Sequence, residues 1–151
     1  IYGRLANQEG RILLKLPPSM DRRAYFGFKT FLGSEGDANV NNCVSCHSAP
    51  KFTDGKSHTV AKGNAAKPTP SLRNSKLSPA DLAKVIREKI ATSRLKRSGK
   101  APDVADAYSR INLTAADIPN LVAFLGTLND ADDKEFRDLI IKAEVFDATI
   151  E

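Results

Sequence analysis

The sequence is poor in cysteine, histidine, methionine and tryptophan. Among its 151 residues are two cysteines, two histidines, one methionine and no tryptophan. Its longest apolar runs fall far short of the about 20 residues that a membrane-spanning helix requires, so we expect a soluble chain. No internal repeat is visible. With 41% hydrophobic residues, the chain can instead form one ordinary domain with its own core.

Both cysteines lie in one short segment, Cys43-Val44-Ser45-Cys46-His47. Cys-x-x-Cys-His is the attachment pattern of a c-type haem. Two thiols three positions apart on a tight turn can reach the two vinyl groups of one porphyrin, and the next residue then lies under the iron. The segment therefore predicts one covalently attached haem on Cys43 and Cys46, with His47 as the proximal iron ligand.

Three other interpretations of this segment fit the sequence less well. A thioredoxin-like redox pair belongs to alternating strands and helices, which the pattern does not indicate. A structural zinc site would have only Cys43, Cys46, His47 and His58 as Cys or His donors, and the adjacent Cys46 and His47 do not suit one tetrahedral metal. A disulfide across two residues would be strained and would close a tiny loop. We therefore favour the covalent haem.

Haem is attached to this pattern after export, so the segment also bears on location. Cysteine content alone does not fix the redox compartment. We expect a bacterial periplasm or an equivalent exported compartment. The chain begins at Ile1 without an initiator methionine or a charged and apolar leader, as expected of a processed protein.

The chain is basic, with a net charge of +5. Its densest cluster, at Arg94, Lys96, Arg97 and Lys100, has no interleaved aromatic residues and no nucleic-acid motif, so we expect no nucleic-acid partner. Such a run usually forms a solvated loop. It could also steer an acidic redox partner towards the protein.

Hydrophobic periodicity predicts two helices before the haem segment. Apolar residues from Tyr2 to Leu16 recur at helical spacing until two prolines, starting at Pro17, stop them. Ser19 or Asp21 can cap a second helix that ends at Gly33. The haem segment itself should then lie on a short helix after a loop rich in glycine and asparagine. We see no convincing strand.

We expect long loops and capped helices to alternate in the part of the chain that follows the haem segment. Residues 49–77 should form a long loop that wraps the cofactor. Ser78, followed by proline, starts a helix, and a polar, basic loop is expected over about 93–112. Thr114 begins another capping pattern, and because a proline follows at position 119 the regular helix should start nearer Asp117.

These patterns divide the chain into three parts. Residues 1–18 would form an N-terminal connector helix, residues 19–130 a mono-haem domain, and residues 131–151 a helical extension. The last helix would begin near Asp132 and carry an apolar stripe as far as Phe146.

Three segments in this order carry a family resemblance. They are Cys43 to Gly55, Pro68 to Asn74, and Leu113-Thr114 followed by Leu121 to Leu128. The chain resembles the carboxy-terminal haem domain of the bacterial di-haem cytochrome c peroxidase superfamily. That superfamily also contains the di-haem enzyme that matures methylamine dehydrogenase. The resemblance covers about residues 24–129.

The resemblance implies an all-α, class I cytochrome c-like fold, in which helices from the two ends of the domain cross and the haem lies in a crevice. It also implies that Arg73 lies near a haem propionate, which a guanidinium suits; the alternative is a surface arginine in a proline-rich loop. We further expect the Pro50 carbonyl to accept a hydrogen bond from the second imidazole nitrogen of His47.

The sequence also departs from that superfamily. Its peroxidases carry two haems, whereas this chain has one attachment segment. They usually have an aromatic-His-Gly segment after Leu-Arg-Asn and later a Met or Tyr that can ligate the iron. Here no Met or His follows His58. Independent peroxidase activity of the two-haem kind is therefore not expected.

The sixth iron ligand decides between an electron carrier and a ligand-binding haem. Candidates are His58 on the wrapping loop, Met20 before the haem helix, a Lys or Tyr such as Tyr108, and an open or water-bound position. A lone methionine near an apolar segment more often fills the core.

We expect a mono-haem c-type cytochrome that carries single electrons between redox partner proteins. One alternative is a high-spin haem enzyme with peroxidase-like activity. Another is a haem subunit of a larger redox complex, docked through the two terminal segments.

Overall fold

A computed structural model describes residues 3–5, 12–14, 20–33, 42–48, 51–73, 75–128 and 148–150. Its helices are α1 (Arg22–Leu32), α2 (Pro79–Arg97) and α3 (Ile118–Thr127), with 3-10 turns η1 (Asp106–Arg110) and η2 (Ala115–Asp117). Its strands are β1 (Gly3–Leu5), β2 (Ile12–Leu14), β3 (Ser57–His58), β4 (Lys67–Pro68) and β5 (Ala148–Ile150).

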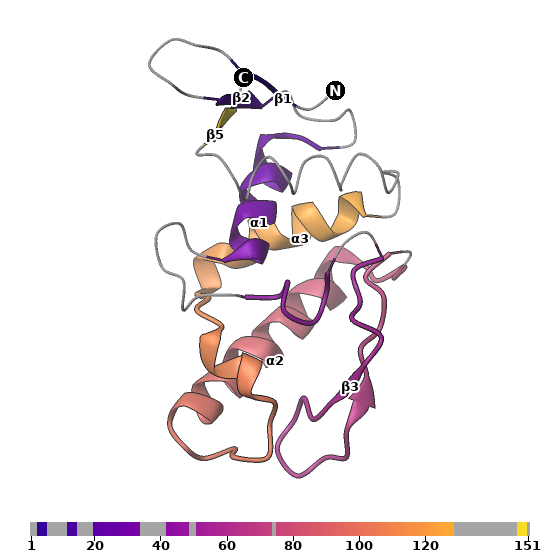
Figure 1. The fold of residues 1–151 in the computed structure, drawn as a ribbon, viewed down its shortest axis with the longest axis vertical. Coiled ribbons are helices and arrows are strands. Elements are labelled where there is room, and N and C mark those ends of the chain that lie inside the picture. Colours follow the sequence, from indigo (N-terminus) through magenta and orange to yellow (C-terminus); the bar gives the residue numbers. More distant parts are fainter. Residues whose placement is uncertain are drawn as a thin grey trace.

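Three helices carry the fold, and their arrangement confirms the all-α prediction. Helix α1 packs mainly against α3, while α2 contacts both α3 and η1. Figure 1 shows α1 and α3 lying together, with α2 running below them. None of the helices that the structure describes is long and apolar enough to cross a membrane.

The predicted first helix over Tyr2–Leu16 is wrong. β1 and β2 pair antiparallel, and β2 pairs in parallel with β5 near the other end of the chain. Gly3 and Gly10 weaken a helix by about 1 kcal/mol each relative to alanine. A strand partner from residues 148–150 lies too far along the sequence for local periodicity to reveal. The expectation of no strand is wrong for the same reason.

Helix α1 begins and ends at predicted capping residues. Asp21 is its N-cap, and the Asp21 carboxylate accepts a hydrogen bond from the Ala24 backbone N–H at 2.8 Å. Gly33 ends the helix with a φ of 135°, a conformation that side chains disfavour. Of the two caps that the sequence offered, Asp21 is therefore the one used.

Helix α2 begins as predicted but runs further than expected. Ser78 caps it and proline occupies the first helical position. The helix continues to Arg97, so Arg94, Lys96 and Arg97 of the basic cluster occupy its last turn, where cations interact favourably with the helix dipole. Lys96 Nζ donates to the Pro102 carbonyl at 3.0 Å, and Arg97 donates to the Ile111 carbonyl. These two side chains therefore fasten the following loop, rather than belonging to a solvated loop themselves.

The start of α3 confirms the expected shift caused by Pro119. Thr114 and Asp117 form a capping box around η2, and the regular helix begins at Ile118. The final helix predicted from Asp132 to Phe146 lies outside the described residues.

An aromatic cluster joins the helices to the segment after the haem motif. Phe31 of α1 lies 5.2 Å from Phe124 of α3 and 5.9 Å from Phe52, measured between ring centroids. Phe28 packs on Phe124 at 5.4 Å. All four rings are buried to within 1% of complete burial. Ring pairs at these separations contribute about 0.5–1.5 kcal/mol beyond the burial of their area.

Candidate haem site

The two cysteines and His47 lie on a single tight turn rather than on the predicted short helix. The backbone N–H groups of Cys46 and His47 donate to the Cys43 carbonyl, at 3.3 and 2.9 Å. The Cys43 N–H donates in turn to the Phe31 carbonyl at 3.0 Å, which ties the turn to the end of α1. Both thiols are free of any disulfide. The turn thus presents two thiols and one imidazole together.

The His47 ring is held by a backbone carbonyl. Its Nδ1 lies 2.9 Å from the Phe52 carbonyl oxygen, so Nδ1 carries the proton in this hydrogen bond and Nε2 keeps its lone pair. The acceptor that the structure shows is Phe52, whereas the predicted acceptor, Pro50, lies outside the described residues. Phe52 has a φ of 57°, in the left-handed region that non-glycine residues rarely adopt. Its buried ring, packed in the aromatic cluster, fixes that conformation.

The environment of the turn sets its protonation states. Burial lowers the pKa of His47, and the Phe52 hydrogen bond only partly opposes this, so the imidazole is neutral as metal binding requires. Burial and the neighbouring Cys46 raise the pKa of Cys43 to about 12. Burial and Asp54 likewise raise the pKa of Cys46. Both thiols are therefore protonated at neutral pH in the folded chain.

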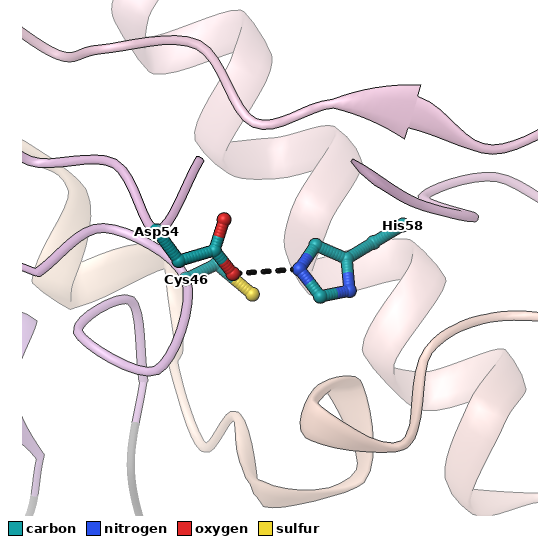
Figure 2. A group of neighbouring side chains, drawn as sticks. All are labelled: Cys46, Asp54 and His58. Atoms are coloured by element: carbon teal, nitrogen blue, oxygen red, sulfur yellow. Dashed lines mark hydrogen bonds and ion pairs between the residues drawn. The ribbon is translucent and has the colours of Figure 1, made fainter. Parts of the chain in front are cut away.

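His58 lies beside the cysteine turn and faces Asp54. Its Nε2 is 2.7 Å from Asp54 Oδ2, and the donor atoms of Cys46, Asp54 and His58 all lie within 4.8 Å of one another (Figure 2). Asp54 Oδ1 also accepts from the Lys56 N–H at 2.9 Å. The wrapping loop thus brings His58 to the cysteine turn, with one of its ring nitrogens engaged by a carboxylate. Iron ligation by His58 stays a prediction.

The other predicted site residues lie in different surroundings. Met20 is 3% exposed and belongs to the hydrophobic core. Arg73 is partly buried, and its backbone N–H donates to Ser71 Oγ at 3.1 Å. The Ser71 hydroxyl donates to the Lys51 carbonyl, which holds this part of the loop near the residues after the cysteine turn. A contact between Arg73 and a propionate stays a prediction.

Lys89 of α2 contacts Tyr108 of η1, and sequence reasoning singled out only Tyr108 of this pair. The Lys89 ammonium lies 5.8 Å from the centre of the Tyr108 ring, and Tyr108 is 6% exposed. Burial is the main cause of the raised pKa of Tyr108, and both cysteines add to it. The position of Lys89 between the buried residues Ile86 and Ile90 was the one available signal in the sequence.

This donor set fits a covalently bound haem. Two free thiols on one turn can form thioethers, and the neutral His47, tethered through Nδ1, offers Nε2 to an iron. Cys43 and its neighbour Val44 pack against a core of aliphatic and aromatic side chains, the surroundings that a porphyrin face requires. No second attachment segment exists in the sequence.

Comparison with known proteins agrees with this geometry. The family model described as Cytochrome c matches residues 34–129, which include the cysteine turn, α2 and α3. The chain belongs to the cytochrome c family. Searches of curated proteins and of solved structures gave no significant match. As a cytochrome c domain the chain implies covalently bound haem c and haem-based electron transfer with redox partner proteins. The finer resemblance to di-haem peroxidases stays a prediction.

Proposed function

We propose that this cytochrome c is a mono-haem carrier of single electrons between partner proteins. The observation that carries the proposal is the hydrogen bond from His47 Nδ1 to the Phe52 carbonyl at 2.9 Å, beside the two free thiols. A carrier needs a proximal ligand that does not move between oxidation states. The buried Phe52 ring and the turn at Cys43 hold His47 in that way.

Cys43 and Cys46 would hold the haem as thioethers, and His47 Nε2 would ligate its iron. The bound haem supplies a reversible one-electron couple. The chain supplies the rest. Phe52 orients the imidazole, and the aromatic cluster anchors the Phe52 ring.

The first experiment is a spectroscopic and potentiometric study of the purified holoprotein. A pyridine haemochrome spectrum should report one haem with two thioether bonds per chain. Redox titration should give one reversible one-electron transition, and the ferric iron should be low-spin by EPR. Absence of covalent haem, or more than one haem per chain, would contradict the proposal.

The same sample separates the carrier from the enzyme alternative. A high-spin ferric iron with multiple turnovers of hydrogen peroxide would establish the peroxidase-like alternative and overturn the carrier proposal. His58 and Asp54 are hydrogen-bonded side chains near Cys46, and they could act as an acid and a base beside the turn. Peroxide turnover should therefore be measured in wild type and in His58→Ala.

We also propose an exported location and an acidic electron-transfer partner. The support for the first is the attachment chemistry of the cysteine turn. The support for the second is the net charge of +5 and the exposed cations Arg94 and Lys100 near the end of α2. Association with such a partner should slow as salt increases, since surface charges are screened within about 10 Å at 0.1 M salt.

Membership of a larger redox complex is the remaining proposal for this chain. In the described parts of the two terminal segments, β2 pairs with β5. Size-exclusion chromatography of the protein from its native source would show a mass well above 16.4 kDa if a stable complex exists.

A further inference from the structure

Three side chains with metal-binding donor atoms meet beside the cysteine turn. The Cys46 sulfur, an Asp54 carboxylate oxygen and a His58 ring nitrogen all lie within 4.8 Å of one another. Figure 2 shows these three groups directed towards one another. Thiolate, imidazole and carboxylate are the ligand types that zinc takes in proteins, at about 2.0–2.3 Å. Donors around one such ion lie about 3–4 Å apart, so this group needs only small shifts to enclose it.

The three donors come from different parts of the chain, and the backbone holds each of them. The Cys46 N–H donates to the Cys43 carbonyl within the turn. Asp54 Oδ1 accepts from the Lys56 N–H at 2.9 Å, which leaves Oδ2 to accept from His58 Nε2 at 2.7 Å. His58 belongs to strand β3, which pairs with β4. The approach of the three side chains therefore does not depend on the hydrogen bond between two of them alone.

The group is partly sheltered from water. The Asp54 side chain is 14% exposed and the His58 side chain 26% exposed, and Cys46 is also partly buried. Fully exposed carboxylates are common without an ion, but this carboxylate lies next to a thiol, which becomes an anion when it binds a metal. A divalent cation would neutralise both negative groups. The group therefore suits a doubly charged ion with water as its fourth ligand.

This group differs from the zinc site that the sequence offered. That site would have combined both cysteines with the adjacent histidine, an arrangement that does not suit one tetrahedral ion. In the structure Cys43 and His47 lie outside the group, and His47 Nδ1 is engaged by the Phe52 carbonyl. The Asp54 carboxylate, which a search for Cys and His donors does not find, supplies the third ligand instead.

We propose that, before haem is attached, Cys46, Asp54 and His58 bind a divalent cation with an affinity for sulfur, of which Zn²⁺ is the type. The Cys46 thiol releases its proton to solvent, and the thiolate sulfur binds the ion. The ion takes the place of the proton between His58 Nε2 and Asp54 Oδ2, and Nδ1 then carries the one proton of the ring. A thioether and a metal thiolate both use the Cys46 sulfur, so the ion and the attached haem exclude each other.

The first test is metal binding by the full chain produced without haem attachment, with cobalt(II) and zinc as the probes. The charge-transfer band of cobalt(II) reports the number of thiolate ligands, and its visible bands report tetrahedral geometry. The chain should bind one ion through one sulfur, and X-ray absorption of the zinc form should also give one sulfur neighbour. Two sulfur neighbours, or no thiolate band, would overturn the proposal.

The two cysteines supply a matched pair of variants. Cys46→Ser removes a ligand, whereas Cys43→Ser changes the same residue type on the same turn but outside the group. Cys46→Ser, Asp54→Ala and His58→Ala should each weaken zinc binding at least about 100-fold, since loss of a partner that only orients a metal ligand already costs about 10- to 100-fold. Cys43→Ser should bind zinc like wild type. Equal losses in the two cysteine variants would refute the assigned ligands, and the wild-type sulfur count decides the question if a variant does not fold.

The holoprotein tests the exclusion between ion and haem. With haem on both cysteines, cobalt(II) should give no thiolate band, and zinc should bind at least about 100-fold more weakly than to the haem-free chain. Equal zinc affinities would refute the exclusion. The exclusion rests on the proposed function, whereas binding to the haem-free chain does not. If the purified protein carries no covalent haem, the proposed function fails; if it carries haem but the haem-free chain binds no ion, only this inference fails.

Discussion

Gly27 of α1 and Asn120 of α3 approach so closely that a Cβ on Gly27 would lie 1.9 Å from the Asn120 carbonyl oxygen. Such a Cβ would also lie 2.9 Å from the Cβ of Phe124. The closer neighbour is backbone in the middle of the helix pair, so it cannot move aside cheaply. The crossing of α1 and α3, whose first helix holds the cysteine turn through the Phe31 carbonyl, therefore depends on a residue without a side chain.

Gly27→Ala should separate the two helices and destabilise the holoprotein. Overpacking of a tight contact costs about 3 kcal/mol, towards the upper end of the usual range. Denaturant unfolding followed by the haem absorbance would measure the change in free energy. Gly126→Ala is the matched control, because a Cβ there meets nothing within 4 Å. That control should be neutral or slightly stabilising, by up to about 1 kcal/mol.

Asn42→Ala should remove a polar link across the site. The Asn42 side chain donates to the Thr30 carbonyl at 2.6 Å and accepts from the Asn112 N–H at 2.8 Å, and it is 5% exposed. Its loss leaves two backbone groups without their partner, and we expect a destabilisation of about 2 kcal/mol. Thermal unfolding checks this, with the exposed Asn64→Ala as control. Equal melting temperatures for the two variants would contradict the assigned role of Asn42.

Acid should weaken the wrapping loop through Asp54. Its carboxylate accepts from the Lys56 N–H and from His58, and these bonds lower its pKa from 3.8 to about 2. Because the folded-state pKa lies below the unfolded one, this contribution to stability is present above about pH 4 and disappears as the pH falls towards 2.

Asp54→Asn should remove that part of the pH dependence. The measurement is the unfolding free energy of wild type and variant at several pH values between 5 and 2. The difference between the two proteins should shrink as the pH falls, because the wild-type carboxylate becomes protonated. A difference that stays constant across this range would show that Asp54 does not contribute through its charge. Asp103→Asn, on an exposed carboxylate, is the control.

Removal of one thioether should leave the haem attached but change its spectrum. In Cys43→Ala or Cys46→Ala, one vinyl group remains unreacted, so the pyridine haemochrome band should shift to longer wavelength than in wild type. The double variant should lose haem when the denatured protein is extracted with acidic organic solvent. Ser48→Ala, an exposed residue next to His47, should behave like wild type. Retention of haem by the double variant would exclude attachment through these cysteines.

Several features of this protein could be predicted from its sequence because they depend on interactions between neighbouring residues. The caps at Asp21 and Ser78 and the delay of α3 caused by Pro119 depend on residues within one turn of each helix end. The cysteine turn was recognisable because the attachment of haem demands a fixed spacing. The same local logic failed over residues 2–16, where β2 has a partner at residues 148–150 that no local pattern indicates.

The sequence by itself predicted the haem attachment residues and the proximal histidine, and it determined the approximate positions of the three main helices, because each follows from bonding or capping over a few neighbouring residues. Only the tertiary structure decided that Phe52 holds His47, that Asp54 engages His58, and that Lys89 lies over the Tyr108 ring. It also decided that Gly27 lets α1 meet α3. These relationships join elements whose approach is set by packing, and packing depends on the whole chain at once.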